Sequence, residues 1–126
     1  MRRAVRKPLG FTLLELLVVV TIIGILAAIA IPQFIAYRQR GYDARANGDL
    51  RNAATAEEAY FTTQGEYLDC DNEDCETTLP EFDLSPEVSI SMRGVNGTQP
   101  SFTGQASSSL GSKAFSYDST AGGIQD

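Results

Sequence analysis

Residues 10–32 read GFTLLELLVVVTIIGILAAIAIP, and this apolar stretch decides how the rest of the chain is organised. From Phe11 to Ile31 the only charged side chain is Glu15. As a helix, these 21 residues would span roughly 31 Å, which matches a bilayer hydrocarbon core of about 30 Å. The sequence therefore predicts a transmembrane helix over 11–31.

Glu15 is costly in such a helix. A charged side chain at mid-bilayer costs about 2.5 to 3.5 kcal/mol on insertion scales, so we expect a partner or a function for Glu15. Its position is equally compatible with a first-turn acid near the lipid headgroups, which the helix dipole would stabilise. Position alone does not choose between these two interpretations.

Basic residues and one small residue precede the apolar stretch. Arg2, Arg3, Arg6 and Lys7 have no acid among them, and this asymmetry favours a cytoplasmic N-terminus. An ordinary secretory signal has its small-residue cleavage site after the apolar run, whereas Gly10 comes before it. The pattern is therefore not that of an ordinary secretory signal.

The short basic leader, the order Gly10, Phe11, Thr12 and the position of Glu15, fifth after Gly10, resemble the prepilin signature of type IV pilins. The close match covers residues 1–42, a third of the chain. It is specific because cleavage site, acid and apolar length must all agree.

The resemblance implies a definite sequence of events. A prepilin peptidase in the inner membrane would cut the leader 1–10 off between Gly10 and Phe11 and methylate the new amino group of Phe11. Inner-membrane assembly machinery would then move the subunits from the bilayer into a helical filament of identical copies. There Glu15 would pair with the Phe11 ammonium of a neighbouring subunit, because an unpaired buried charge costs several kcal/mol. The precursor would be a single-pass inner-membrane protein with a cytoplasmic N-terminus, and the assembled form an extracellular pilus.

Gly24 and Pro32, which also fall where the pilin family has them, are the weak points of the apolar helix. Proline removes the hydrogen bond to the carbonyl of Ala28, and glycine has low helix propensity. The resemblance suggests that the segment from Gly24 to Pro32 partly unwinds in the filament. A gentle kink is the simpler alternative.

The helical pattern continues beyond Pro32, with apolar residues at spacings near three and four up to Phe61. We predict one helix over 11–62, about 78 Å long, whose second half carries a globular head over 63–126. Residues 63–87 have the composition of an acidic loop. The head is too small for more than a modest core.

Cys70 and Cys75 are the only cysteines, and they lie in a segment that should face an oxidising compartment. We expect a disulfide between them. The neighbouring acids could ligate a hard cation such as Ca²⁺, but their spacing does not match an EF-hand loop, so we predict a solvated acidic loop without a metal. These acids are Asp69, Asp71, Glu73, Asp74 and Glu76.

After Pro86 the period changes to two, which is typical of half-buried strands. We predict a three-stranded antiparallel meander over 88–118, with turns at 94–97 and 107–112 and a mobile tail at 119–126. The helix stripe around 50–61 should cover its apolar face. The fold class is α+β. The apolar face consists of Val88, Ile90, Met92, Phe102, Phe115 and Tyr117.

Charge and composition exclude several functions. The net charge is −6, and removal of four leader cations leaves six basic against sixteen acidic residues. An acidic surface without clustered Lys or Arg argues against sequence-specific nucleic-acid binding. The chain has no histidine, the commonest general base, and no other catalytic constellation. We therefore predict neither an enzyme nor a cofactor.

The leading interpretation is a structural subunit of a type IV pilus, most similar to the type IVa major pilins. The filament would serve adhesion, twitching motility or DNA uptake. A pseudopilin of type II secretion is the alternative, since it shares the N-terminal signature. Electron conduction along an aromatic series is a lesser alternative, because packing explains the same residues. The series is Phe11, Phe34, Tyr37, Tyr42, Tyr60, Phe61 and Tyr67.

Overall fold

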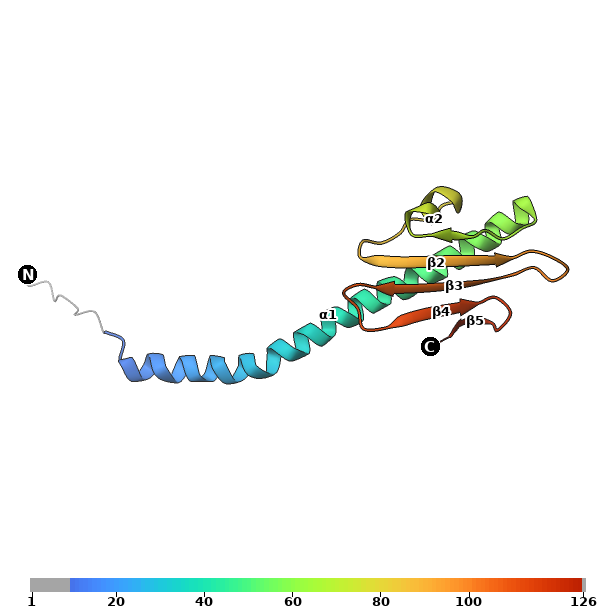
Figure 1. Ribbon diagram of the computed structural model, residues 1–126. Coiled ribbons are helices and arrows are strands. Elements are labelled where there is room, and N and C mark those ends of the chain that lie inside the picture. Colours follow the sequence, from blue (N-terminus) through green and yellow to red (C-terminus); the bar gives the residue numbers. More distant parts are fainter. Residues whose placement is uncertain (1–9, 126) are drawn as a thin grey trace, which may run out of the picture. The chain divides into compact units, whose positions relative to one another are not determined.

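The computed structural model describes residues 10–125. The predicted leader therefore lies outside the described residues except for Gly10, and so does Asp126 of the predicted tail. The chain divides into two compact units with a boundary between Ile35 and Ala36, and each is described by itself. The elements in chain order are α1 (Leu13–Gln64), β1 (Cys70–Asp71), α2 (Glu73–Thr78), β2 (Val88–Val95), β3 (Ser101–Ser108), β4 (Ala114–Asp118) and β5 (Gly123–Gln125) (Figure 1).

The predicted long helix is present as α1, which has 52 residues and includes Pro32. It begins two residues later than predicted and ends two residues later. Gly65 follows it with a positive φ of 78°, and its N–H donates to the carbonyl of Phe61 over 2.8 Å. A left-handed glycine in this position is a common way to end a helix.

The predicted α+β class is confirmed, but the expectation of three strands was wrong, because the antiparallel sheet has five in the order β1-β2-β3-β4-β5. β1 has only two residues, with Cys70 opposite Met92. Such a short strand cannot show the alternation of apolar and polar residues from which strands are predicted. β5 lies in the segment predicted to be a mobile tail, where Ile124 pairs with Tyr117 of β4. Gly122, just before β5, and Gly123, its first residue, both have positive φ and reverse the chain here.

The turn expected at 94–97 lies later in the chain, at 96–100, because β2 continues to Val95 and β3 begins at Ser101. β2 and β3 pair along their whole length, from Val88 opposite Ser108 to Val95 opposite Ser101. Gly94 is therefore a strand residue, and a turn is not the reason for a glycine at this position. A Cβ at Gly94 would come within 2.6 Å of the Tyr67 carbonyl oxygen, so the chain leaving α1 can cross here only over a glycine.

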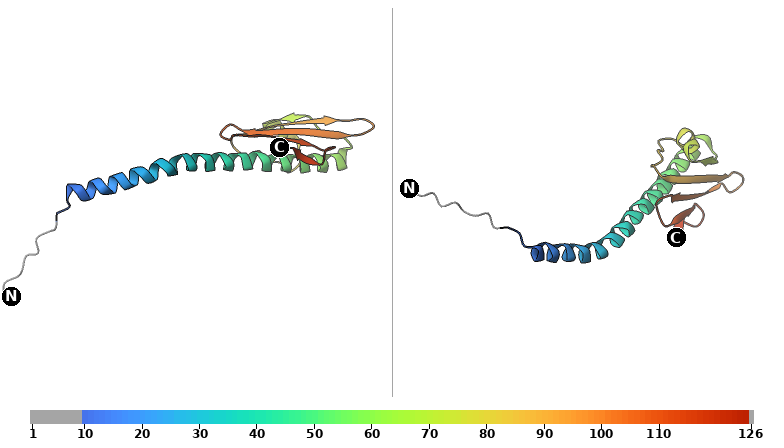
Figure 2. Two further views of the ribbon diagram at one scale, coloured as in Figure 1. Left: turned by 90° about the horizontal axis from the view of Figure 1, so that it is seen from below. Right: turned by 60° about the vertical axis from the view of Figure 1, so that its left-hand side comes forward.

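The core of the head lies between the sheet and one face of the C-terminal part of α1 (Figure 2). Leu50 and Ala53 of α1 are fully buried, as are Met92 and Phe102 of the sheet. This confirms the predicted packing of the helix stripe on the apolar sheet face. The segment expected to be only an acidic loop also contains α2 and adds buried Cys75, Leu79 and Phe82 to the core.

The close approach at Gly94 yields a stability prediction. Gly94→Ala should lower the free energy of unfolding of the full chain in detergent by about 1 to 3 kcal/mol, because the new methyl group overlaps backbone atoms that cannot yield easily. Thermal or denaturant unfolding followed by circular dichroism measures the change. Gly97→Ala is the matched control, since nothing lies within 4 Å of its Cβ position. Equal stability of the two variants would contradict the assigned crossing.

Candidate assembly site

Thr12 and Glu15 form a capping box at the start of α1. The Thr12 N–H and hydroxyl both donate to Glu15 Oε2 over 2.9 Å, and the Glu15 N–H donates to Thr12 Oγ1 over 3.2 Å. Such reciprocal bonds satisfy backbone donors that a helix leaves unpaired at its N-terminus. The T-x-x-E pattern at 12–15 is the sequence signal for this cap, which the charge of Glu15 alone does not predict.

Gly10 and Phe11 lie immediately before this cap and are exposed, with 77% of Phe11 accessible. The predicted cleavage site is thus accessible and outside the helix. Phe11 and Glu15 lie at the same end of α1. The ion pair expected between them joins two copies of the chain and remains a prediction, as do cleavage and methylation.

The first part of α1 exposes an unusually large apolar surface. The helix contains one stretch that is long and apolar enough to cross a membrane. Large exposed apolar patches mark sites of contact with lipid or protein. The exposed large side chains here are Leu13, Leu14, Leu16, Leu17, Val18, Val19, Val20, Ile22, Ile23, Ile25, Leu26, Ile29, Ile31, Phe34 and Ile35.

The segment from Gly24 to Pro32 is helical throughout. No atom lies within 4 Å of a Cβ placed on Gly24. Together with Ala28, one turn further on, Gly24 provides a small-residue face that would let another helix backbone approach closely. The proposed unwinding in a filament concerns a different state of the chain and remains a prediction.

Comparison with known proteins places this N-terminal region in a family. Residues 6–31 match the model of the prokaryotic N-terminal methylation motif. The chain is 32% identical over 117 residues to the type IV major alpha-pilin of Moraxella bovis, covering 83% of this chain and 70% of that protein. This chain belongs to the type IV pilin family.

Two other relatives match over about half of the chain. The pilin is 48% identical over 64 residues to the type IV major pilin protein PilA of Myxococcus xanthus, and 42% identical over 62 residues to the type IV wide pilus major component PilA4 of Thermus thermophilus. These matches cover 51% and 49% of the pilin but only 29% and 47% of the relatives. The chain thus spans less than half the length of these two proteins.

Buried carboxylates on α1 hold the loops of the pilin head. Asp43 accepts hydrogen bonds from the Ser112 N–H and hydroxyl, both over 2.8 Å, and from the Lys113 N–H over 3.0 Å. Asp49 accepts the Ser85 N–H over 2.8 Å and its hydroxyl over 2.9 Å. Burial acts against the charged form of Asp43, but the bonds from Ser112 and Lys113 outweigh it and lower the pKa.

Glu57 is the third buried acid of α1 and the least satisfied. Its side chain is fully buried, and its Oε2 accepts the Leu68 N–H over 3.0 Å while its Oε1 has no partner. Burial raises the pKa of Glu57, the Leu68 bond opposes this, and the charges of Asp69 and Glu58 add to the rise. The burial of these three acids was not predicted from the sequence, because an isolated acid in a helical pattern is expected to face solvent.

Cys70 and Cys75 form a disulfide, which links β1 to α2. The acids expected around it do not converge. Asp71 forms an ion pair with Arg93 at 2.8 Å, and Asp69 accepts the Gly94 N–H over 2.7 Å. Among the described residues, no three His, Cys, Asp or Glu side chains are grouped as a metal site would require.

Two members of the aromatic series, Phe61 and Tyr67, belong to the packing of the head. Their rings stack with centroids 4.4 Å apart, and Tyr67 then contacts Phe102 at 4.9 Å. Phe102 in turn stacks on Tyr117 at 5.3 Å. Aromatic packing of this kind stabilises a small core and accounts for the positions of these two residues.

Glu57 makes the stability of the head depend on pH. The pKa of Glu57 in the folded state is raised above the ordinary 4.5. The folded state therefore binds the proton of Glu57 more tightly than the unfolded chain does. Its contribution is therefore complete below about pH 4.5 and declines as the pH rises through the folded-state pKa. Glu57→Gln should flatten this decline in unfolding experiments between pH 4 and 8.

Glu66→Gln is the control for this experiment, since Glu66 is exposed. It should leave the pH dependence unchanged. If the unfolding free energy of Glu57→Gln depended on pH as steeply as that of the unmodified chain, Glu57 would be charged in the folded head without a loss of stability, and the prediction would be wrong.

Proposed function

We propose that this chain is the structural subunit of a type IV pilus, cut between Gly10 and Phe11, methylated on Phe11 and then polymerised. Its precursor is held in the inner membrane by α1, and the assembled form is an extracellular filament. The task of the filament, in adhesion, motility or DNA uptake, is a property of the assembly rather than of the single chain.

The exposed apolar surface at 13–35 is the observation that carries this proposal. Side chains of this kind are stable only in lipid or against other apolar helices. Transfer from the first environment to the second keeps them away from water throughout. An interface that joins different patches of identical copies and does not close then yields an open helical filament.

The alternative of a type II secretion pseudopilin is not favoured. The relatives named above are described as pilus proteins, including one that aligns along 83% of the chain.

Glu15→Gln separates the charge of Glu15 from its role in the cap. Glutamine preserves the capping box, so membrane insertion and cleavage should continue. Filament yield should fall at least tenfold, because the Phe11 ammonium then meets a neutral group in an apolar core. Electron microscopy and immunoblotting of sheared surface material measure the yield.

Gly10→Ala is the companion variant, and it should leave the leader attached and prevent filament formation. Intact mass of the unmodified, sheared material should correspond to a chain that begins with N-methylated Phe11 and contains one disulfide. Processed chain confined to the inner membrane would contradict the proposed function. Full filament yield from Glu15→Gln would contradict the ion pair alone.

A further inference from the structure

The charged side chains of the head are separated into two regions. Between Arg51 and Arg93 the sequence contains eleven acidic residues and no lysine or arginine. All four arginines of α1 lie within 38–51, where the only acids, Asp43 and Asp49, are buried and hydrogen-bonded to loops. The exposed charge of this part of α1 is therefore entirely positive.

One flank of the head carries three of the cations, Arg40, Arg51 and Lys113, and we call it the basic flank. Arg40 and Arg51 are eleven residues apart, about three helical turns, so they lie on the same face of α1. Lys113 and Arg40 line one shallow hollow of about 350 Å³. Within residues 10–125 the only ion pair joins Arg93 and Asp71. The buried carboxylate of Asp43 also lines this hollow, and Glu58 lines another with Arg51. Arg40 and Lys113 together therefore leave the first hollow with an excess of positive charge.

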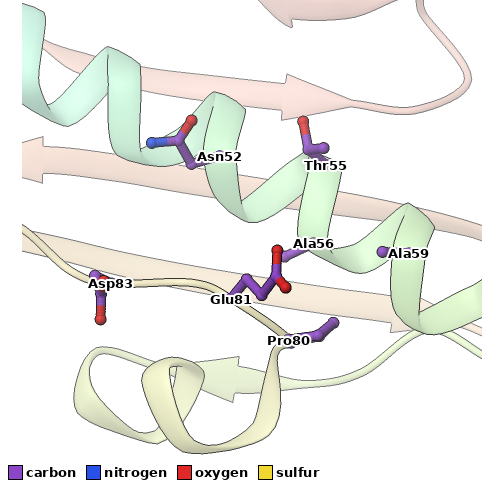
Figure 3. A pocket seen from close by; sticks show the side chains of 7 residues that line it. All are labelled: Asn52, Thr55, Ala56, Ala59, Pro80, Glu81 and Asp83. Atoms are coloured by element: carbon purple, nitrogen blue, oxygen red, sulfur yellow. The ribbon is translucent and has the colours of Figure 1, made fainter.

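An acidic groove of about 410 Å³ lies on another flank of α1. The helix contributes Asn52, Thr55, Ala56 and Ala59, and the segment after α2 contributes Pro80, Glu81 and Asp83 (Figure 3). Glu81 and Asp83 are exposed. In Figure 3 the Glu81 side chain reaches from its loop toward α1. The groove is thus lined by two acidic residues of one loop, and the Glu81 carboxylate is the one that reaches toward the helix (Figure 3).

Arg40 and Lys113 of the basic flank line a different hollow from the acidic groove and share no lining residue with it. The groove lies on the side of α2, next to the β1 edge of the sheet, whereas Lys113 immediately precedes β4 on the other side (Figure 1). Two complementary surfaces on different sides of one molecule can pair only with those of other copies. Such a contact is heterologous, and its repetition gives an open assembly.

We propose that Arg40 and Lys113 of one copy dock into the acidic groove of a neighbouring copy. This inference rests on the proposed function and adds a second interface, made by the heads, to the contacts of the apolar helices. Charge complementarity of this kind fixes register and suppresses wrong pairings. The groove is centred on α1 residues 52–59 and the basic pair lies beside 40–43, so parallel copies are displaced by roughly 20 Å along the helix.

Disulfide trapping tests this contact in filaments of the full chain. The double variant Lys113→Cys with Asp83→Cys should give a ladder of multimers on non-reducing electrophoresis of sheared, oxidised filaments. The native cysteines are already paired with each other. Lys113→Cys with Gln105→Cys is the control, and it should give no ladder, since Gln105 is exposed on the face of β3 away from the core.

Charge exchange provides a second test that needs no cysteine. Asp83→Lys and Lys113→Glu should each reduce filament yield about fivefold at low salt, and the combined variant should recover most of it. Glu66→Lys changes the net charge by the same amount outside the groove and should have no effect.

The two tests separate failure of this interface from failure of the proposed function. If the unmodified chain forms filaments, but neither the ladder nor the recovery is seen, the docking of the basic flank is wrong while the pilus subunit stands. If the unmodified chain forms no filaments at all, the proposed function itself fails.

Discussion

The head depends on hydrogen bonds that run from buried carboxylates of α1 to backbone N–H groups of its loops. Asp43 holds the turn between β3 and β4, Asp49 holds the residue before Pro86, and Glu57 holds the chain as it leaves the helix. Charge-assisted bonds such as those of Asp43, whose pKa they lower, are about twice as strong as neutral ones. They fix the loops at defined levels along α1, which apolar contacts alone would leave free to slide. The core of Leu50, Ala53 and the sheet then closes between these fixed points.

Periodicity explains which parts of the structure the sequence could predict. The apolar stretch, the long helix and the alternating strands at 88–118 follow from periodicity, because each repeats its signal several times. β1 and β5 have two and three residues, too few to repeat anything, and their pairing is decided by the strands beside them. Gly94 was predicted to be a turn residue. The structural reason for a glycine at this position is the close approach of Tyr67, which lies 27 positions earlier in the chain.

The functional residues divide in the same way. Gly10, Phe11 and Glu15 could be predicted as site residues because a family signature specifies their order, and their roles stay predictions, whereas the buried Asp43, Asp49 and Glu57 carry no signature. An acid on an otherwise apolar helix face is ambiguous until its partner is known, and those partners lie between 11 and 70 residues away. The disulfide could be anticipated from two cysteines in one oxidising segment. Its closed loop is short, so by the chain-entropy model its stabilising effect is smaller than that of a long loop.

Glu15 shows how one side chain can serve both the single chain and an assembly. A carboxylate offers about four lone-pair sites on two oxygens. Both bonds from Thr12 go to Oε2, which leaves Oε1 able to accept a donor from outside the helix. The capping box also orients the carboxylate before any partner arrives, so that less conformational entropy is lost when an ammonium group binds. The local cap is therefore compatible with the proposed contact between copies, and it would prepare the carboxylate for that contact.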